Sequence, residues 1–165
     1  CMIDGPSQFD FYSGGGLDIA FLGFGEIDAV GNVNVSKLGG NTVGPGGFID
    51  IAQHARKVVF CGTFDTGGAR TEVGSGVMRV TEHGRISKLV DKVDQITFSG
   101  PQSLLQGQKV IYITERAVFE LRENGLHIIE IAPGIDLQTD LLDRMGFAPN
   151  MNSPLSEMDS NYFRK

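Results

Sequence analysis

Residues 15–60, GGLDIAFLGFGEIDAVGNVNVSKLGGNTVGPGGFIDIAQHARKVVF, decide the fold. The apolar run over 17–24 is short and bounded by glycine, which is typical of a strand buried on both faces. Residues 39–48 contain five glycines and predict a loop. A helix is expected next over 48–55, and then a second buried strand over 57–64. Strand, loop, helix and strand in this order predict a parallel sheet in an α/β domain.

The remainder of the chain predicts further strands and one helix. Gly31-Asn32 is expected to form a turn between two short extended pieces, and Asn124-Gly125 a type I′ hairpin turn. Asp136 is expected to cap a helix that ends before Gly146. Strands are expected in two pieces over 77–90 with a turn at 82–85, and over 95–99, 110–114 and 126–131. The sequence thus predicts one domain over 1–150 and an irregular C-terminal tail over 151–165.

Composition argues against several classes of protein. The net charge of −6 and the absence of a dense basic stretch argue against nucleic acid as a partner. No stretch approaches the ~20 consecutive apolar residues of a membrane-spanning helix. Cys1 and Cys61 are too few for a disulfide framework, and the N-terminus lacks the basic region and apolar core of a secretory signal. We therefore expect a cytoplasmic protein that does not enter the membrane.

The sequence contains no self-sufficient catalytic motif. The three histidines, His54, His83 and His127, are scattered, and none has a second ligand at metal-binding spacing. Ser7, His54 and Asp50 are residue types of a catalytic triad, but no nucleophile-elbow motif supports that interpretation. Neither a Walker sequence nor the dinucleotide-binding glycine pattern is found. We expect no metal and no cofactor.

The loop Gly44-Pro45-Gly46-Gly47-Phe48 is the strongest candidate for chemistry. It leads directly into the expected helix, so several backbone N–H groups at the helix start lack intrahelical partners. Such a helix end favours anions, and glycine lets a bulky reacting group approach the backbone. From the residues alone, a phosphate, a carboxylate or the oxyanion of a thioester could occupy this place.

Three segments in fixed order resemble the β half of class I coenzyme A (CoA) transferases. They are Gly31-Asn32-Val33-Asn34, the loop Gly44-Pro45-Gly46-Gly47-Phe48, and the run ITERAVF over 113–119. The resemblance covers nearly the whole chain and corresponds to the C-terminal part of that half. The segment SQFDFYSGGGLDIAFLG over 7–23 is most similar to fused enzymes of the acetate and propionate type. The resemblance implies an α/β fold with a sheet flanked by helices. A segment that precedes these residues would complete the sheet.

The resemblance also implies a mechanism and a set of site residues. In this family a glutamate attacks the acyl-CoA thioester, and CoA, which is a substrate, then forms a glutamyl-CoA thioester. Backbone N–H groups stabilise the oxyanions. Gly46 and Gly47 match the oxyanion loop, and Gln8 falls where relatives place an amide near the reacting carbonyl. Gly44 and Phe48 would contact the substrate, with Phe48 lining the acyl pocket or packing beneath it. Gly67, Gly68 and Arg70 would lie near CoA, in a loop where several relatives carry a lysine before the glycines. Thr66 stands in place of that lysine, and Arg70 could supply the charge.

The glutamate itself is missing from the matching positions. Glu26, Glu72, Glu115 and Glu130 lie in the wrong sequence context, and no residue before Gln8 fits. We therefore expect an upstream portion, or a separate chain, to carry the nucleophile, and we expect the 165 residues alone to be inactive. The expected partners are an acyl-CoA such as acetyl- or propionyl-CoA, a short carboxylic acid, and further copies in a homo-oligomer.

Two other functions remain open on the sequence. The same general fold occurs in sugar-phosphate isomerases and in regulatory domains that bind sugar phosphates, where a glycine loop would hold phosphate. A citrate-lyase-type subunit that transfers acyl groups to a carrier protein is closer in chemistry. Affinity for sugar phosphates without affinity for CoA would favour the regulatory module.

Overall fold

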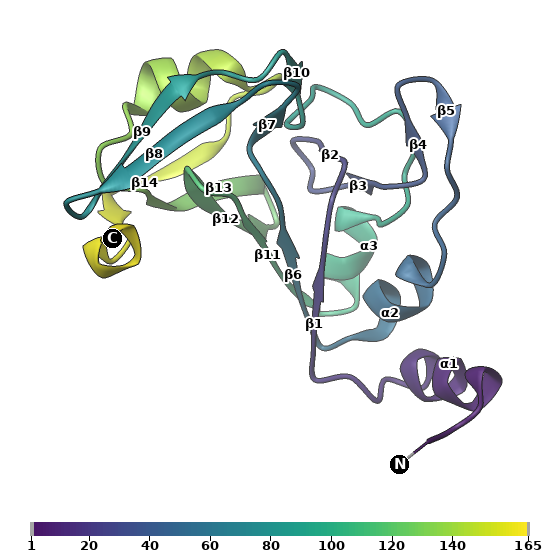
Figure 1. The fold of residues 1–165 in the computed structure, drawn as a ribbon. Coiled ribbons are helices and arrows are strands. Elements are labelled where there is room, and N and C mark those ends of the chain that lie inside the picture. The colour runs from purple at the N-terminus through teal and green to yellow at the C-terminus, as the bar shows by residue number, and fades with distance from the viewer. Residues whose placement is uncertain (1, 165) are drawn as a thin grey trace.

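A six-stranded mixed sheet forms the centre of the computed structural model, which describes residues 2–164 (Figure 1). Its strands, in spatial order, are β1 (Ile19–Leu22), β6 (Lys57–Cys61), β11 (Lys109–Ile113), β12 (Ala117–Arg122), β13 (Gly125–Ile131) and β14 (Asn150–Glu157). β1, β6 and β11 run parallel, β12 is antiparallel to both of its neighbours, and β14 is parallel to β13. The parallel sheet and α/β class expected from residues 15–60 are confirmed.

Three helices lie on the same side in Figure 1: α1 (Gly5–Ser13), α2 (Phe48–His54) and α3 (Gly100–Leu105). α2 is the helix expected after the glycine loop. α3 was not expected, although its signals are ordinary: Pro101 stands in the first turn, and the Ser99 hydroxyl accepts the Gln102 N–H at 3.4 Å.

Four two-stranded ribbons surround the main sheet. They pair β2 (Glu26–Ile27) with β3 (Val33–Asn34), β4 (Lys37–Leu38) with β5 (Asn41–Thr42), β7 (Asp65–Thr66) with β10 (Ile86–Ser87), and β8 (Arg70–Gly74) with β9 (Val77–Glu82). The turn at Gly31-Asn32 is confirmed between β2 and β3. The two strands expected over 77–90, with a turn at 82–85, are present as β9 and β10. They do not pair with each other, because β9 is antiparallel to β8 across the turn Ser75-Gly76, and β10 pairs with β7.

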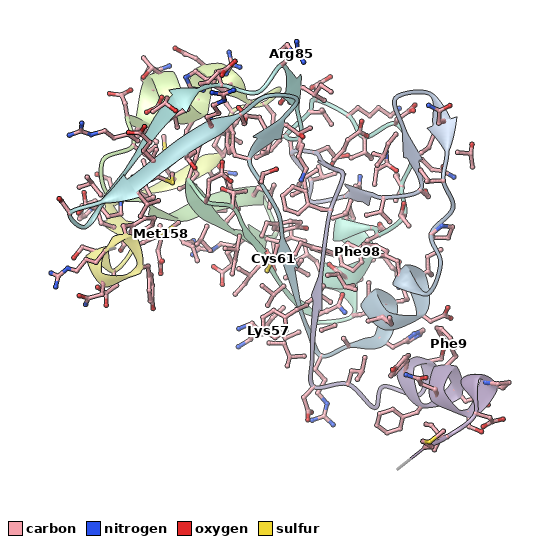
Figure 2. The ribbon with its side chains drawn as sticks, in the orientation of Figure 1. Phe9, Lys57, Cys61, Arg85, Phe98 and Met158 are labelled. Carbon is pink, nitrogen blue, oxygen red and sulfur yellow. The ribbon has the colours of Figure 1, made fainter. Side chains whose placement is uncertain are left out.

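The main core packs between one face of the sheet and α2 and α3. Phe60 on β6 lies at its centre, with ring centroids 5.8 Å from Phe48, 5.3 Å from Tyr112 and 5.0 Å from Phe98. Figure 2 shows Phe98 on the side of the sheet where α3 lies. Burying one such aromatic ring contributes about 1.5–3 kcal/mol relative to leaving it in water. These contacts position the start of α2, and with it the glycine loop.

The opposite face of the parallel strands carries apolar side chains that no other part of the described chain covers. Phe21 is 66% exposed and Ile19 41%, while Ala20 between them is buried. The expectation that the first strand is buried on both faces is therefore wrong. β1 is an edge strand with one open face, although its composition is that of an interior strand.

Several expected elements differ in the second half of the chain. Residues 95–99 form an isolated bridge from Phe98 to Val33 and not a strand. The turn at Asn124-Gly125 is present, but only Gly125 has a positive φ, of 102°, so a type I′ turn is not formed. Asp136 does cap a helical segment, since its Oδ1 accepts the N–H groups of Gln138 and Thr139 at 3.0 and 2.7 Å. That segment comprises a π-helical turn, Leu137–Leu141, and a 3₁₀ turn, Leu142–Arg144.

The prediction of an irregular tail over 151–165 is wrong for residues 151–164, and Lys165 lies outside the described residues. β14 extends the main sheet beside β13, and a 3₁₀ turn, Ser160–Phe163, follows it. Phe163 is buried in a second small core with Met78 and Ala132. Pro154, Asn150 and Asn152 are unusual residues for a strand, but they occur in an edge strand, where one row of backbone groups needs no partner strand.

Candidate functional site

The glycine loop connects β5 to α2 in a left-handed backbone path. Gly44 and Gly46 have φ values of 81° and 55°, which residues with a Cβ adopt only under strain. The N–H groups of Val43 and Gly44 both donate to the Ser36 carbonyl, at 2.8 and 3.1 Å. These bonds fix the start of the loop against the bend between β3 and β4.

Two amides of this loop remain open. Phe48 N–H donates to the Pro45 carbonyl at 3.1 Å. The N–H groups of Gly46 and Gly47, in contrast, have no hydrogen-bond partner within residues 2–164. Two adjacent free donors on a rigid glycine backbone are the arrangement that an anionic oxygen can accept from.

α1 packs over this loop through Phe9. A Cβ added at Gly47 would lie 2.9 Å from the Phe9 ring, so a side chain at this position would displace that ring. Figure 2 shows Phe9 between α1 and α2. Phe48 is buried at the start of α2 and stacks on Phe60 in the main core. Gln8 lies on α1, exposed, where its side-chain amide donates to the Tyr12 hydroxyl.

The second group of expected residues lies at the turn after β7. Gly67 and Gly68 have φ values of 81° and 107°, and the Gly67 carbonyl accepts the Arg85 Nε–H at 3.0 Å. Arg70 is exposed and its Nε lies 3.4 Å from Glu82 Oε2. Such a surface pair contributes little to stability, so Arg70 remains free to exchange Glu82 for another anion.

A cleft of about 470 Å³ lies between these two regions, at the carboxyl ends of β1 and β6. It brings Gly39, the first glycine of the loop predicted over 39–48, to the same surface as Thr66, which precedes Gly67. Its lining also includes Phe24, Leu38, Thr63 and Lys88. None of the expected site residues is part of this lining, so the structure does not bring them together in this cavity: Gln8, Gly44, Gly46, Gly47, Phe48, Gly67, Gly68 and Arg70.

Lys88 was not expected from the sequence. Its Nζ lies 4.0 Å from the centroid of the Phe24 ring, a cation–π contact. Partial burial lowers the pKa of Lys88 below its ordinary value, and the nearby charge of Glu115 acts in the opposite direction. Glycine at position 62 makes room for the ammonium, because a Cβ there would lie 3.0 Å from Nζ.

A buried ionic network lies beneath the cleft and connects three distant segments. Arg116, fully buried, donates from Nη2 to Asp65 Oδ1 at 2.9 Å and from Nη1 to the Asp140 carbonyl at 3.0 Å. Its guanidinium lies 4.6 Å from the Phe64 ring centroid. Glu115 lies 3.2 Å from Arg116 Nε and accepts the Phe64 N–H at 2.8 Å. The network fixes the chain that leaves β6 against the turn between β11 and β12.

Comparison with known proteins gives strong matches. The chain is 50% identical over 162 residues to the acetate CoA-transferase YdiF of Escherichia coli O157:H7, covering 98% of the chain. It is 48% identical over 166 residues to the caffeate CoA-transferase of Acetobacterium woodii. The chain is a homologue of CoA-transferases. It spans 30% of the length of the first relative and 32% of the second. No family model matches it.

Solved structures of CoA-transferases contain the same fold. The apoenzyme of the Escherichia coli O157:H7 acyl-CoA transferase YdiF superposes with a TM-score of 0.96 at 50% identity, over 99% of this chain and 32% of that one. Glutaconate CoA-transferase from Acidaminococcus fermentans has a TM-score of 0.70 at 18% identity, and the decarboxylase AibA/AibB 0.70 at 24%, so these two show the fold alone.

The described part of this CoA-transferase homologue lacks both a membrane-spanning helix and a metal-binding cluster. Between residues 2 and 164, no helix is long and apolar enough to cross a membrane. Histidine, cysteine and acidic side chains in the same residues form no group that could hold a metal ion. Of the two cysteines, Cys61 is a free thiol, and Cys1 lies outside the described residues.

Proposed function

We propose that this chain is part of an acyl-CoA:carboxylate CoA-transferase that moves CoA between a short-chain acyl-CoA and a free acid such as acetate. The observation that carries the proposal is the pair of unpartnered N–H groups at Gly46 and Gly47, in a chain 50% identical to an acetate CoA-transferase. Those N–H groups would donate hydrogen bonds to the thioester oxygen and stabilise the negative charge that develops on it during attack.

The proposed reaction has two linked halves. An enzyme glutamate, supplied outside these 165 residues, attacks the thioester carbonyl and expels the CoA thiolate, which leaves an acyl-glutamyl anhydride. The thiolate then attacks the glutamyl carbonyl, the first acid leaves as its carboxylate, and a glutamyl-CoA thioester remains. An incoming carboxylate reverses both steps to give the new acyl-CoA.

The residues of this chain would stabilise and position the reacting groups. Gly46 and Gly47 donate to each tetrahedral oxyanion, and the side chain of Gln8, released from Tyr12, supplies a further amide. Gly44 gives the loop its path and Phe48 supports it from the core. Gly67, Gly68 and Arg70 face the CoA moiety, where Arg70 exchanges Glu82 for phosphate oxygen. The enzyme works as an oligomer that supplies the rest of the site.

The first test is the mass of the intact enzyme after incubation with acetyl-CoA and then borohydride. A CoA-dependent adduct or its reduced product on a glutamate outside this chain supports the proposal. Absence of an adduct, together with binding of sugar phosphates, would replace it with the regulatory-module function.

The oxyanion role of the loop has a matched pair of variants. Gly46 and Gly107 have φ values of 55° and 69°, and a Cβ at either would meet nothing within 4 Å. Alanine therefore introduces a similar strain, about 1 kcal/mol, at both positions. Gly107 lies in the turn between α3 and β11, so strain there leaves the donors of the glycine loop in place. We therefore expect Gly46→Ala to lower kcat about 10²-fold or more and Gly107→Ala to leave kcat nearly unchanged. Equal effects on kcat would exclude a special role for Gly46.

A further inference from the structure

The cleft contains a cation that lacks a bonded counter-ion. Lys88 is half-buried, and no carboxylate of residues 2–164 lies within ion-pair distance of its Nζ. Glu115, whose charge acts on Lys88, is already bound to Arg116 and to the Phe64 N–H. A partly desolvated charge without a bonded partner is unfavourable, and an anion in the cleft would relieve that cost.

The remaining lining indicates which kind of anion fits. Thr63 and Thr66 bring hydroxyl groups, whereas Ser87 already donates to the carbonyls of Leu89 and Arg144. Glu26 also lines the cleft, and its Oε2 accepts hydrogen bonds from Asn34 and from the Asp94 N–H. This fixed negative charge disfavours a dianion and directs a monoanion toward Lys88.

The apolar part of the cleft has the size of a short hydrocarbon chain. Phe24, Leu38 and Ile86 contribute side-chain surface between the charged ends. One ammonium, two hydroxyl groups and an apolar wall match a carboxylate with a few carbon atoms. The carboxylate of Glu26 in the same lining disfavours the second negative charge of a phosphate, so a carboxylate fits this cleft better.

We propose that Lys88 binds the carboxylate of the free acid in this cleft, beside the carboxyl ends of β1 and β6. The inference deepens the proposed function, on which it rests for the identity of the acid as a substrate. Lys88 is then a specificity residue: it selects a monoanionic acid, and Phe24 holds its ammonium in place through the cation–π contact.

The test compares Lys88→Met with Lys92→Met in the full-length enzyme. Methionine keeps most of the side-chain length and removes the charge, and Lys92 is an exposed lysine four residues away. A hydrogen bond to a charged group is worth about 1.5–3 kcal/mol, which corresponds to at least tenfold in affinity. We therefore expect Lys88→Met to raise the KM for butyrate as acceptor at least tenfold and to leave the KM for acetyl-CoA unchanged. Lys92→Met should change neither.

Direct binding separates this inference from the proposed function. Calorimetric titration of wild-type enzyme with butyrate should show binding that weakens as pH rises through the lowered pKa of Lys88, because only the ammonium binds the carboxylate. Lys88→Arg should keep part of the affinity. A further outcome is an enzyme that binds butyrate, loses that binding on Lys88→Met, and shows no transferase activity. That result would refute the proposed function but support Lys88 as a carboxylate-binding residue.

Three results would overturn the inference. One is an unchanged KM for butyrate in Lys88→Met, in an enzyme that transfers CoA normally. Another is a higher KM for acetyl-CoA alone, which would assign Lys88 to CoA. The third is a Lys88→Met enzyme that no longer binds inorganic phosphate but still binds butyrate, which would make the cleft a phosphate site.

Discussion

At the scale of single residues, the run Gly31-Asn32-Val33-Asn34 forms a polar hub, although its sequence suggested only a turn. Asn32 donates to Asp28 through its backbone N–H and its side-chain amide, and its Oδ1 accepts the Gly100 N–H at 3.1 Å. Tyr112, fully buried, donates to the Gly31 carbonyl at 2.6 Å. The turn was predictable because Gly-Asn is a local signal. The contacts with Gly100 and Tyr112 were not, since these residues lie 68 and 81 positions away in sequence.

The buried hydroxyl of Tyr112 makes stability depend on alkaline pH. Burial, with a smaller contribution from Asp28, raises the pKa of Tyr112 well above its ordinary value of 10.0. The neutral phenol is therefore favoured in the folded state, and its contribution is complete below pH 10 and is lost as pH rises further. Tyr112→Phe should destabilise by about 1–2 kcal/mol at pH 7.

This difference should narrow by about 1 kcal/mol at pH 11, because only the wild type must keep a phenol protonated there. Urea unfolding of both proteins at pH 7 and pH 11 measures the change. Groups that titrate in both proteins cancel in the comparison. A constant difference would mean that Tyr112 ionises as readily in the folded state as in the unfolded chain.

At the scale of elements, the sequence predicts a helix or strand when the signal lies within that element. It does not predict an element that forms only by pairing with a partner. α2, β6 and the Asp136 cap follow from their own residues. β8 was missed because Arg70–Gly74 is polar and mostly exposed, and it becomes a strand only by pairing with β9. Lys88 was missed as a site residue for the same reason, since nothing in its sequence neighbours indicates that Phe24 and Gly62 adjoin its ammonium.

The C-terminal segment illustrates the same dependence on packing, and a substitution there can measure it. Phe163 is 8% exposed against Met78 and Ala132, whereas its neighbour Tyr162 is 76% exposed. Phe163→Ala should lower the free energy of unfolding by about 3 kcal/mol, and Tyr162→Ala by less than about 0.5 kcal/mol. Thermal or urea unfolding measures both. Equal, small effects would indicate that the segment after β14 is not packed in solution.

At the scale of the whole molecule, the sheet has an open edge at β1 and an apolar face beside it. Apolar side chains on an unpaired edge strand favour association with other polypeptide. The sequence indicated the parallel sheet, but the run over 17–24 appeared fully buried because its composition reflects a cover that residues 2–164 do not provide.

We expect the 165-residue polypeptide to self-associate through this face. Phe21→Lys places a charge at its centre and should shift the sedimentation coefficient toward that of a monomer over a range of concentrations. Leu105→Lys is the control, because Leu105 is 83% exposed but lies on α3. If Leu105→Lys acts as strongly as Phe21→Lys, or neither acts, association does not use the open face.

The position of Arg116 also determines how the molecule responds to ionic strength. Dissolved ions screen charges that water reaches, such as the pair of Arg56 and Asp18, whose side chains are 76% and 85% exposed. Arg116 and Asp65 are 0% and 3% exposed, so the ions of a concentrated buffer hardly reach them. The segments that meet beneath the cleft are thus held by an interaction that salt scarcely weakens, while the surface pairs around them lose their effect.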